Sequence, residues 1–242
     1  MGVGGRDVDL RNEFAAANVI TQQSPLAARI RGCTACDSLA SSAAATVRPF
    51  KKPCAQFDIY TRWLPDSVRV AFIAESPPGK SEGYFYDPTP TPGYAQLLRR
   101  GLFGLLELLG HDTATRLTAF KERGYILLDT VKCRCRKHGS HPPTTVTATC
   151  ATAWLGKELE EIGAPRRLCI LGRTALEGLS QVTGFGPLGR YTVSENTGET
   201  ASIGAHEVLI WPFPSPRNAH IFRSHISRFK QFCNVPSAAR ES

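Results

Sequence analysis

Residues 68–79 read VRVAFIAESPPG, an apolar run that ends abruptly at a carboxylate and two prolines. A short continuous apolar run of this kind is typical of a strand that is buried on both faces, as in a parallel sheet. Three further runs have the same character, and they are Tyr125 to Val131, Arg167 to Leu171 and His206 to Trp211. With Val68 to Ala74 as the first, the chain therefore contains four predicted strands.

Helical patterns separate these runs. Leucines recur at helical spacing over Tyr94 to Leu109, and Gly110 is a suitable end for that helix. The other helical segments are Thr145 to Ile162, Thr174 to Val182 and Arg217 to Phe232. The alternation predicts an α/β fold, a three-layer sandwich in which ligands bind beyond the carboxyl ends of the strands.

The length of 242 residues fits one sizeable domain. We expect that domain to cover residues 18–235, with loose tails over 1–17 and 236–242. No apolar run reaches the roughly 18 residues of a membrane span, and the first residues lack the apolar core of a signal peptide. These features predict a cytoplasmic protein with no membrane partner.

The formal net charge of +8 and the pI of about 9.2 favour a polyanionic partner, and nucleic acid is the first candidate. Two basic clusters are candidates for phosphate contacts, with a solvated basic face as the alternative. The first cluster contains Lys132, Arg134, Arg136, Lys137 and His138, and the second contains Arg217, Arg223, Arg228 and Lys230.

Eight cysteines are many for a protein of a reducing compartment, where metal ligands or buried apolar residues are commoner than disulfides. Cys33 and Cys36 form a Cys-x-x-Cys pair, and Cys133 and Cys150 flank a basic loop far downstream. Three readings stay open: a [4Fe–4S] cluster, structural zinc, or free buried thiols. Cys135 competes with Cys133 as the third ligand, whereas we expect Cys54, Cys169 and Cys233 to lie in the core.

Four motifs, each near a predicted strand end or helix, occur in an order that resembles a known family. They are Cys33-x-x-Cys36, then residues 74–79 (AESPPG), then residues 129–134 (DTVKCR) with Cys150, and finally residues 214–218 (PSPRN). The chain from about residue 25 to residue 232 resembles the iron–sulfur-containing, family 4-like branch of the uracil-DNA glycosylase superfamily. The last motif is similar to that of the single-strand-selective class.

The resemblance implies a four-stranded parallel sheet in an α/β/α sandwich. It implies that Cys33, Cys36, Cys133 and Cys150 hold a [4Fe–4S] cluster. It also implies a monofunctional DNA glycosylase of base excision repair, which hydrolyses the N-glycosidic bond of a damaged base and leaves an abasic site. The partner is then DNA with a flipped-out base, and we expect a monomer that associates with the nucleoid.

The family motif gives Glu75 the role of assisting the attacking water, because a carboxylate can orient water and stabilise a cationic sugar. A helix-capping or solvated carboxylate is the alternative. Ser76 and Pro77 belong to a stiff loop that suits contact with DNA. The family places an aromatic side chain nearby to stack on the flipped base, and Phe85 is the first candidate, with Tyr86 next.

Asp129 departs from the family pattern, in which an asparagine usually reads uracil. An ionised aspartate only accepts hydrogen bonds and would repel uracil O4. Burial that keeps Asp129 protonated, a different donor in the pocket, or a different base such as a deaminated purine would each resolve the conflict. A residue without any base contact is the fourth reading.

Phe213 is the second departure, since the family commonly has a histidine donor just before the Pro-Ser of this motif. His220, Arg217 or backbone amides are candidate replacements, and we include Ser215 and Asn218 among the binding residues by their place in the motif. Without a replacement, the chain is a slow enzyme or a binding protein of the same fold. A zinc-stabilised RNA-binding protein without a base pocket is the third functional hypothesis.

Overall fold

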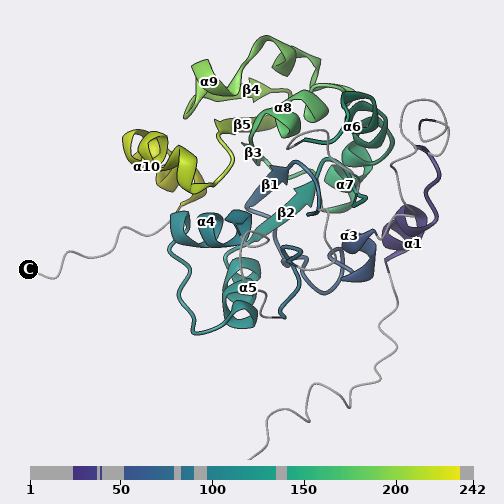
Figure 1. The fold of residues 1–242 in the computed structure, drawn as a ribbon, viewed down its shortest axis with the longest axis horizontal. Helices are drawn as coiled ribbons and strands as arrows, with labels where there is room; N and C mark the ends of the chain where they lie inside the picture. The colour runs from purple at the N-terminus through teal and green to yellow at the C-terminus, as the bar shows by residue number, and fades with distance from the viewer. Residues whose placement is uncertain are drawn as a thin grey trace, which may run out of the picture.

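The computed structural model describes residues 24–36, 39, 52–78, 83–89, 97–134 and 141–234. A five-stranded sheet with the order β2-β1-β3-β5-β4 forms its centre (Figure 1). The strands are β1 (Val70–Ala74), β2 (Tyr125–Asp129), β3 (Arg167–Leu171), β4 (Thr200–Ile203) and β5 (His206–Trp211). All neighbours are parallel except β4, which pairs antiparallel with β5.

The expectation of a four-stranded parallel sheet is corrected, because the sheet has a fifth strand. The four predicted runs are the four parallel strands, but β4 adds an antiparallel edge that joins β5 through a tight turn. Along β4, exposed and buried residues alternate, so this strand has no continuous apolar run. Two predicted boundaries were also too wide, because β1 begins at Val70 and β2 ends at Asp129.

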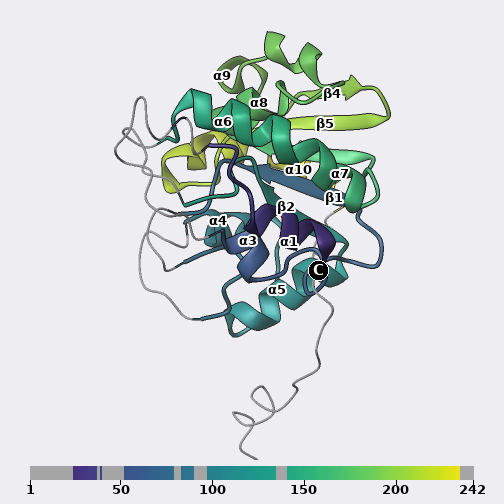
Figure 2. The same ribbon diagram turned by 90° about the vertical axis from the view of Figure 1, so that its right-hand side faces the viewer.

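Helices cover both faces of the sheet, with α6, α7 and α8 on one side and α4, α5 and α10 on the other (Figure 1). The predicted long helix after the second cysteine motif is a continuous run of α6 (Thr144–Cys150), a π-helical turn η2 (Ala151–Leu155) and α7 (Gly156–Glu161). The other helices are α1 (Pro25–Arg31), α3 (Pro53–Gln56), α4 (Leu97–Leu105), α5 (Thr113–Glu122), α8 (Arg173–Leu179), η3 (Gly186–Arg190), α9 (Val193–Asn196), η4 (Pro216–Asn218) and α10 (Ala219–Cys233). The short helices α1 and α3 contact each other (Figure 2).

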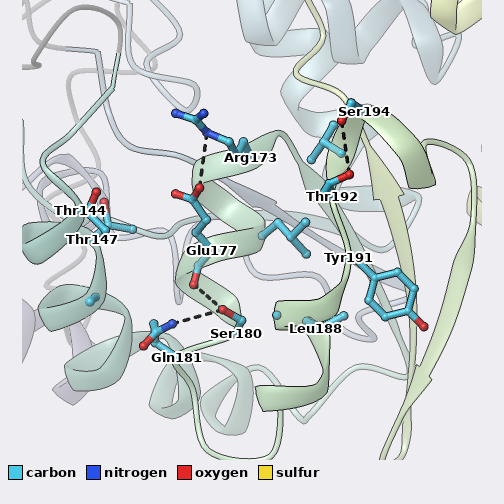
Figure 3. A pocket seen from close by; sticks show the side chains of 14 residues that line it. Thr144, Thr147, Arg173, Glu177, Ser180, Gln181, Leu188, Tyr191, Thr192 and Ser194 are labelled. Atoms are coloured by element: carbon cyan, nitrogen blue, oxygen red, sulfur yellow. Dashed lines mark hydrogen bonds and ion pairs between the residues drawn. The ribbon is translucent and has the colours of Figure 1, made fainter.

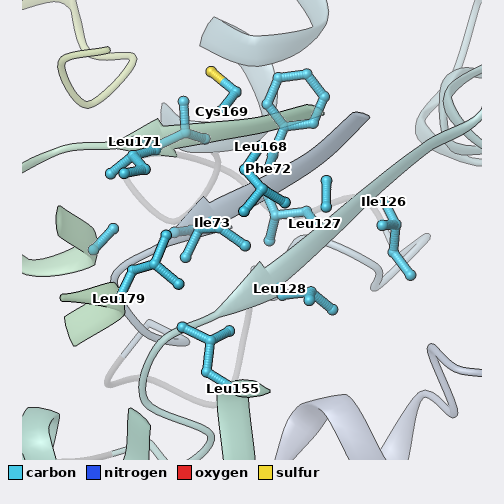
Figure 4. Close-up of a cluster of buried hydrophobic side chains, with 14 of the residues drawn as sticks. Phe72, Ile73, Ile126, Leu127, Leu128, Leu155, Leu168, Cys169, Leu171 and Leu179 are labelled. Atoms are coloured by element: carbon cyan, nitrogen blue, oxygen red, sulfur yellow. The ribbon is translucent and has the colours of Figure 1, made fainter. Parts of the chain in front are cut away.

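The core forms because successive residues of each strand point to opposite faces. Phe72 packs against Phe120 of α5 and Phe229 of α10, with ring centroids 5.8 and 6.3 Å apart. Its neighbour Ile73 lies on the other side of the sheet, toward Leu155 and Leu179 (Figure 4). The three-layer α/β/α arrangement follows. Within the described part of the chain, no helix is long and apolar enough to span a membrane.

Candidate active site

A pocket of about 440 Å³ lies beyond the carboxyl ends of β1, β3 and β5. This volume lies in the usual range for small-ligand sites. Its wall includes Glu75, Ser76, Phe85, His141, Thr174 and Phe213. The carboxyl ends of the parallel strands all lie at this edge of the sheet. Segments from four distant parts of the chain therefore contribute to one site.

Glu75 follows β1 directly, and its carboxylate is held on one oxygen by two neighbours. His141 Nδ1 lies 2.6 Å from Glu75 Oε2, and the Thr174 hydroxyl donates to the same oxygen over 3.1 Å. The Thr174 hydroxyl also lies 3.2 Å from His141 Nδ1. Only 13% of the Glu75 side chain is exposed, whereas 45% of the His141 side chain is. A carboxylate oriented in this way faces a pocket that a water and a ligand can enter.

Three other predicted residues line the same pocket, namely Ser76, Phe85 and Phe213. The Ser76 hydroxyl donates to Glu75 Oε1 over 3.4 Å. Phe85 is held edge-on by the rings of Phe103 and Phe120, at centroid distances of 5.6 and 5.2 Å. Because its neighbours fix this ring, Phe85 offers a rigid aromatic surface at the pocket wall.

Other predicted residues lie elsewhere. Tyr86 is buried beneath β2, where its hydroxyl donates to the Leu127 carbonyl and accepts from the Leu127 amide. It is therefore a core residue, and the expectation that it stacks on a base is corrected. Pro77 is buried, and the proline in the pocket wall is Pro78 instead.

Asp129 is also absent from the pocket wall. It ends β2 opposite Ala74 of β1 and is only 3% exposed. Its backbone carbonyl accepts a hydrogen bond from the Lys132 ammonium. Asp129 therefore adjoins the site from the neighbouring strand without lining the cavity.

The C-terminal motif, residues 214–218, forms a turn after β5, and none of its residues lines the pocket. The Asn218 amide donates to the Phe213 carbonyl over 2.9 Å, and the Ser215 backbone amide donates to the same carbonyl over 2.8 Å. Arg217 and His220 are exposed and do not border the cavity. His220 therefore does not replace the missing histidine, and this expectation is corrected.

Sequence reasoning missed His141 and Thr174. His141 belongs to the loop between Cys133 and Cys150, which we interpreted only as a basic loop. Thr174 is the second residue of α8 and lies three residues after the end of β3, and a hydroxyl so close to a strand end was the available signal. For His141 no local signal exists, because only the fold brings this loop back to Glu75.

The four cysteines of the predicted cluster border a second, smaller cavity. Cys33, Cys36, Cys133 and Cys150 all line it, together with Lys52, Lys132 and Trp154. Three N–H groups point at the sulfurs: the Trp154 indole donates to Cys33 over 3.0 Å, and backbone amides donate to Cys33 and Cys150. Burial, and then the neighbouring Cys150, raise the pKa of Cys133.

A single ion does not fit these side chains as they stand. Within the ranges that the structure describes, no group of three or more His, Cys, Asp or Glu side chains is placed to hold one metal ion. The four cysteines line one cavity of only about 10 Å³. The rival ligand Cys135 lies outside the described residues, and Cys54, Cys169 and Cys233 are buried in the core as predicted.

The first basic cluster is only partly a surface feature. Lys132 is 1% exposed and forms an ion pair with Glu158, whose other oxygen accepts from the Tyr60 hydroxyl. The expectation that Lys132 contacts phosphate is therefore wrong. Arg134 is half-buried and donates to the Pro78 carbonyl over 2.8 Å, whereas residues 136–138 lie outside the described ranges. In the second cluster, Arg217, Arg223 and Arg228 are exposed, and Lys230 pairs with Glu107.

A larger groove of about 810 Å³ runs along the outer face of α8, between α6 and the segment from η3 to α9 (Figure 3). Its charged side chains are Arg173 and Glu177, which pair with each other over 3.4 Å and are largely exposed. The groove lacks a confined carboxylate, so the smaller Glu75 pocket is the better candidate for chemistry.

An α/β sandwich with an aromatic-walled pocket at the carboxyl ends of its strands is typical of α/β proteins that bind ligands at this edge of the sheet. The family model of the Uracil DNA glycosylase superfamily matches residues 61–235, which is most of the chain, and the protein belongs to this superfamily. Comparison with curated proteins finds no match.

Proposed function

We propose that the protein is a monofunctional DNA glycosylase that hydrolyses the N-glycosidic bond of uracil or a related deaminated base in DNA. The observation that carries this proposal is the Glu75 carboxylate, held by His141 and Thr174 in the wall of a pocket that Phe85 and Phe213 also line. Membership of the superfamily supports the same activity. The product is an abasic site in DNA and a free base.

The reaction needs a target nucleotide that has left the base stack. The base enters the pocket beside the Phe85 ring, and its sugar faces Glu75. The bond between C1′ and the base nitrogen breaks, and its electron pair leaves with the base. A water oxygen bonds to C1′, while Glu75 orients this water and accepts its proton.

His141 and Thr174 are positioning residues for Glu75 in this scheme. Both donate toward Oε2 when the His141 Nδ1 carries its proton, so the carboxylate is fixed in one orientation. The negative carboxylate then also stabilises the positive charge that develops on the sugar.

The test uses the full chain and oligonucleotides that carry uracil, hypoxanthine or xanthine, with alkali-labile breaks as the readout. Glu75→Gln should slow cleavage by about 10²–10⁴-fold, the usual contribution of a positioned acid or base, and should spare DNA binding. Glu177→Gln is the matched control, because this exposed glutamate lies on α8 outside the pocket. Unchanged cleavage by Glu75→Gln would refute the proposed role.

A binding protein of the same fold is the second candidate. Phe213 favours it, because a phenylalanine in the pocket wall cannot donate a hydrogen bond to the leaving base. Selective binding of a uracil-containing oligonucleotide without any break under single-turnover conditions would select this candidate.

We further propose that the chain belongs to the iron–sulfur branch and holds a [4Fe–4S] cluster through Cys33, Cys36, Cys133 and Cys150. The four cysteines line one small cavity, and N–H groups such as the Trp154 indole donate to the sulfurs of Cys33 and Cys150. Hydrogen bonds to sulfur are a common feature of protein-bound clusters. The bound cluster would join the segment around α1 to β2 and α6.

Metal analysis of the purified protein separates the cluster from structural zinc, because the cluster brings iron and sulfide and a brown colour. Cys36→Ser should lower the iron content, whereas Cys169→Ser, in the core strand β3, should retain it. Full iron in Cys36→Ser would show that the ligand set is wrong. The monomeric state and the association with the nucleoid stay predictions.

A further inference from the structure

Residues 130–134 directly follow β2 and form hydrogen bonds with the backbone that carries Glu75. The Thr130 amide and the Thr130 hydroxyl both donate to the Ala74 carbonyl over 2.8 Å. The Val131 amide donates to the Glu75 carbonyl over 2.9 Å. The pairing of β1 with β2 therefore continues past the ends of both strands and holds the backbone of the candidate catalytic residue.

Arg134 extends these contacts to the pocket wall. Its side chain is half-buried, and its Nη1 donates to the Pro78 carbonyl over 2.8 Å. Pro78 and Glu75 both line the candidate active site. Residues 130–134 therefore hold the pocket-lining loop, residues 75–78, at both of its ends. The loop itself is stiff, because each of its two prolines fixes one φ angle.

The residues between these contacts belong to the cysteine cavity. Lys132 and Cys133 line this cavity, and the Lys132 amide donates to Cys150 Sγ over 3.3 Å. Within five residues the chain thus contacts the Glu75 loop, then the cysteines, then the Glu75 loop again. Because buried segments are closely packed and transmit strain, a displacement at Cys133 acts on both contacts with the loop.

We propose that residues 130–134 couple the cysteine site to the candidate active site, and that Arg134 is a positioning residue for the pocket wall. The inference rests on the proposed metal group and deepens the proposed activity, because it names occupancy of the cysteines as what regulates it. Thiolates bonded to a metal group fix Cys133 and Cys150, and the hydrogen bonds of Val131 and Arg134 then fix the loop. Loss of the group should slow cleavage although none of its four proposed ligands lines the pocket.

The first test measures hydrogen exchange of the Val131 amide in the purified full chain, because this amide bonds directly to Glu75. Cys36→Ser changes a proposed ligand just after α1, far from Val131 in the sequence, so an effect on Val131 has to pass through the cysteine site. It should lower the iron content and speed Val131 exchange about two- to tenfold, the equivalent of one typical hydrogen bond. Cys233→Ser is the matched control, because Cys233 is a buried cysteine that lines neither cavity.

Each outcome of this test decides the coupling. Iron-depleted Cys36→Ser with wild-type exchange at Val131 would overturn it, and so would equal acceleration in Cys233→Ser, which would indicate general destabilisation. A wild type that contains neither iron nor zinc would refute the proposed metal group, and the coupling with it. The readout needs no DNA, so it also decides the question for a chain that does not cleave.

The second test concerns the contact of Arg134 with Pro78. Arg134→Met should retain its iron and slow single-turnover cleavage of a uracil oligonucleotide by up to about 10²-fold, the usual effect of a small misplacement in a site. Arg134→Lys should recover part of the rate, because an ammonium also donates to a carbonyl. Arg123→Met is the matched control, because Arg123 donates to the Leu106 carbonyl over 2.7 Å but lines neither cavity.

A phosphate contact of Arg134 would give a different result. It would reduce the slope of log K against log[salt] by about 0.9 for duplex DNA, whereas a positioning residue leaves the slope unchanged. A reduced slope in Arg134→Met, or wild-type cleavage by this variant, would overturn the positioning role. If the wild type does not cleave, the proposed activity fails, and exchange of the Ser76 amide then decides: Arg134→Met should accelerate it, and Arg123→Met should not.

Discussion

At the scale of single residues, the site depends on hydrogen bonds that orient one carboxylate. Glu75 receives its Oε2 contacts from two elements that are distant in sequence, the loop before α6 and the start of α8. Each contact removes rotational freedom from the side chain that, in the proposed reaction, faces the sugar. The contribution of each donor is therefore measurable through conservative substitutions.

Thr174→Val retains the shape of the side chain and removes the hydroxyl that donates to Glu75. A hydrogen bond to a charged group is worth about 1.5–3 kcal/mol, so we expect the single-turnover cleavage rate to fall roughly ten- to a hundredfold. Thr147→Val is the control, because the Thr147 hydroxyl donates instead to the carbonyl of Pro143, which directly precedes α6. Equal rates for the two variants would contradict the positioning role of Thr174.

The buried pair of Lys132 and Glu158 makes a prediction about stability. Both side chains are at most 1% exposed, and removal of one partner leaves a buried charge without compensation. Lys132→Met should lower the free energy of unfolding by about 3–5 kcal/mol, measured by denaturant titration.

The double variant Lys132→Met/Glu158→Leu should recover part of that loss, because no isolated charge remains in the core. Recovery should be incomplete, since the Tyr60 hydroxyl loses its acceptor. Lys157→Met, at an exposed lysine of α7, is the control and should change the stability little. A double variant less stable than Lys132→Met would contradict this account.

At the scale of secondary structure elements, the close approach of α4 to the turn after β5 shapes the pocket. A Cβ atom at Gly101 would lie 2.5 Å from the Pro214 carbonyl oxygen and 2.8 Å from its Cβ. Both contacts involve the turn that presents Phe213. The glycine therefore sets the distance between two walls of the site.

Gly101→Ala should move α4 or that turn, lower the stability by about 1–3 kcal/mol as overpacking does, and slow cleavage. Gly104→Ala on the same helix is the control, because no atom lies within 4 Å of its Cβ position. It should stabilise the protein by about 0.5–1 kcal/mol through helix propensity and leave cleavage unchanged. A Gly101→Ala variant with full activity and stability would contradict the contact.

The elements that were predictable from sequence are those with a strong local pattern. The runs of β3 and β5 match their observed bounds, because continuous apolar residues bury both faces of a strand. The edge strand β4 is short and alternates exposed with buried residues, so it carries little signal. His141 pairs with Glu75, and Lys132 pairs with Glu158. The two residues of each pair are distant in the sequence, so no local pattern predicts these contacts.

At the scale of the whole molecule, the net charge of +8 predicts a salt-dependent affinity for DNA. The net charge alone does not indicate where DNA lies on the protein. Glu75 and Phe213 line the pocket at the carboxyl edge of the sheet, where the proposed reaction would hold the target nucleotide. The phosphates should therefore follow that edge, near the exposed residues of η4 and α10.

The salt dependence of binding tests this footprint. If Arg217, exposed on η4, contacts one phosphate, Arg217→Ala should reduce the slope of log K against log[salt] by about 0.9 for duplex DNA and about 0.7 for a single strand. Arg69→Ala is the control, because Arg69 directly precedes β1 and therefore lies at the opposite edge of the sheet. It should leave the slope unchanged. Equal changes in both variants would mean that DNA responds to the overall charge, and the assignment of the carboxyl edge as the DNA-binding face would fail.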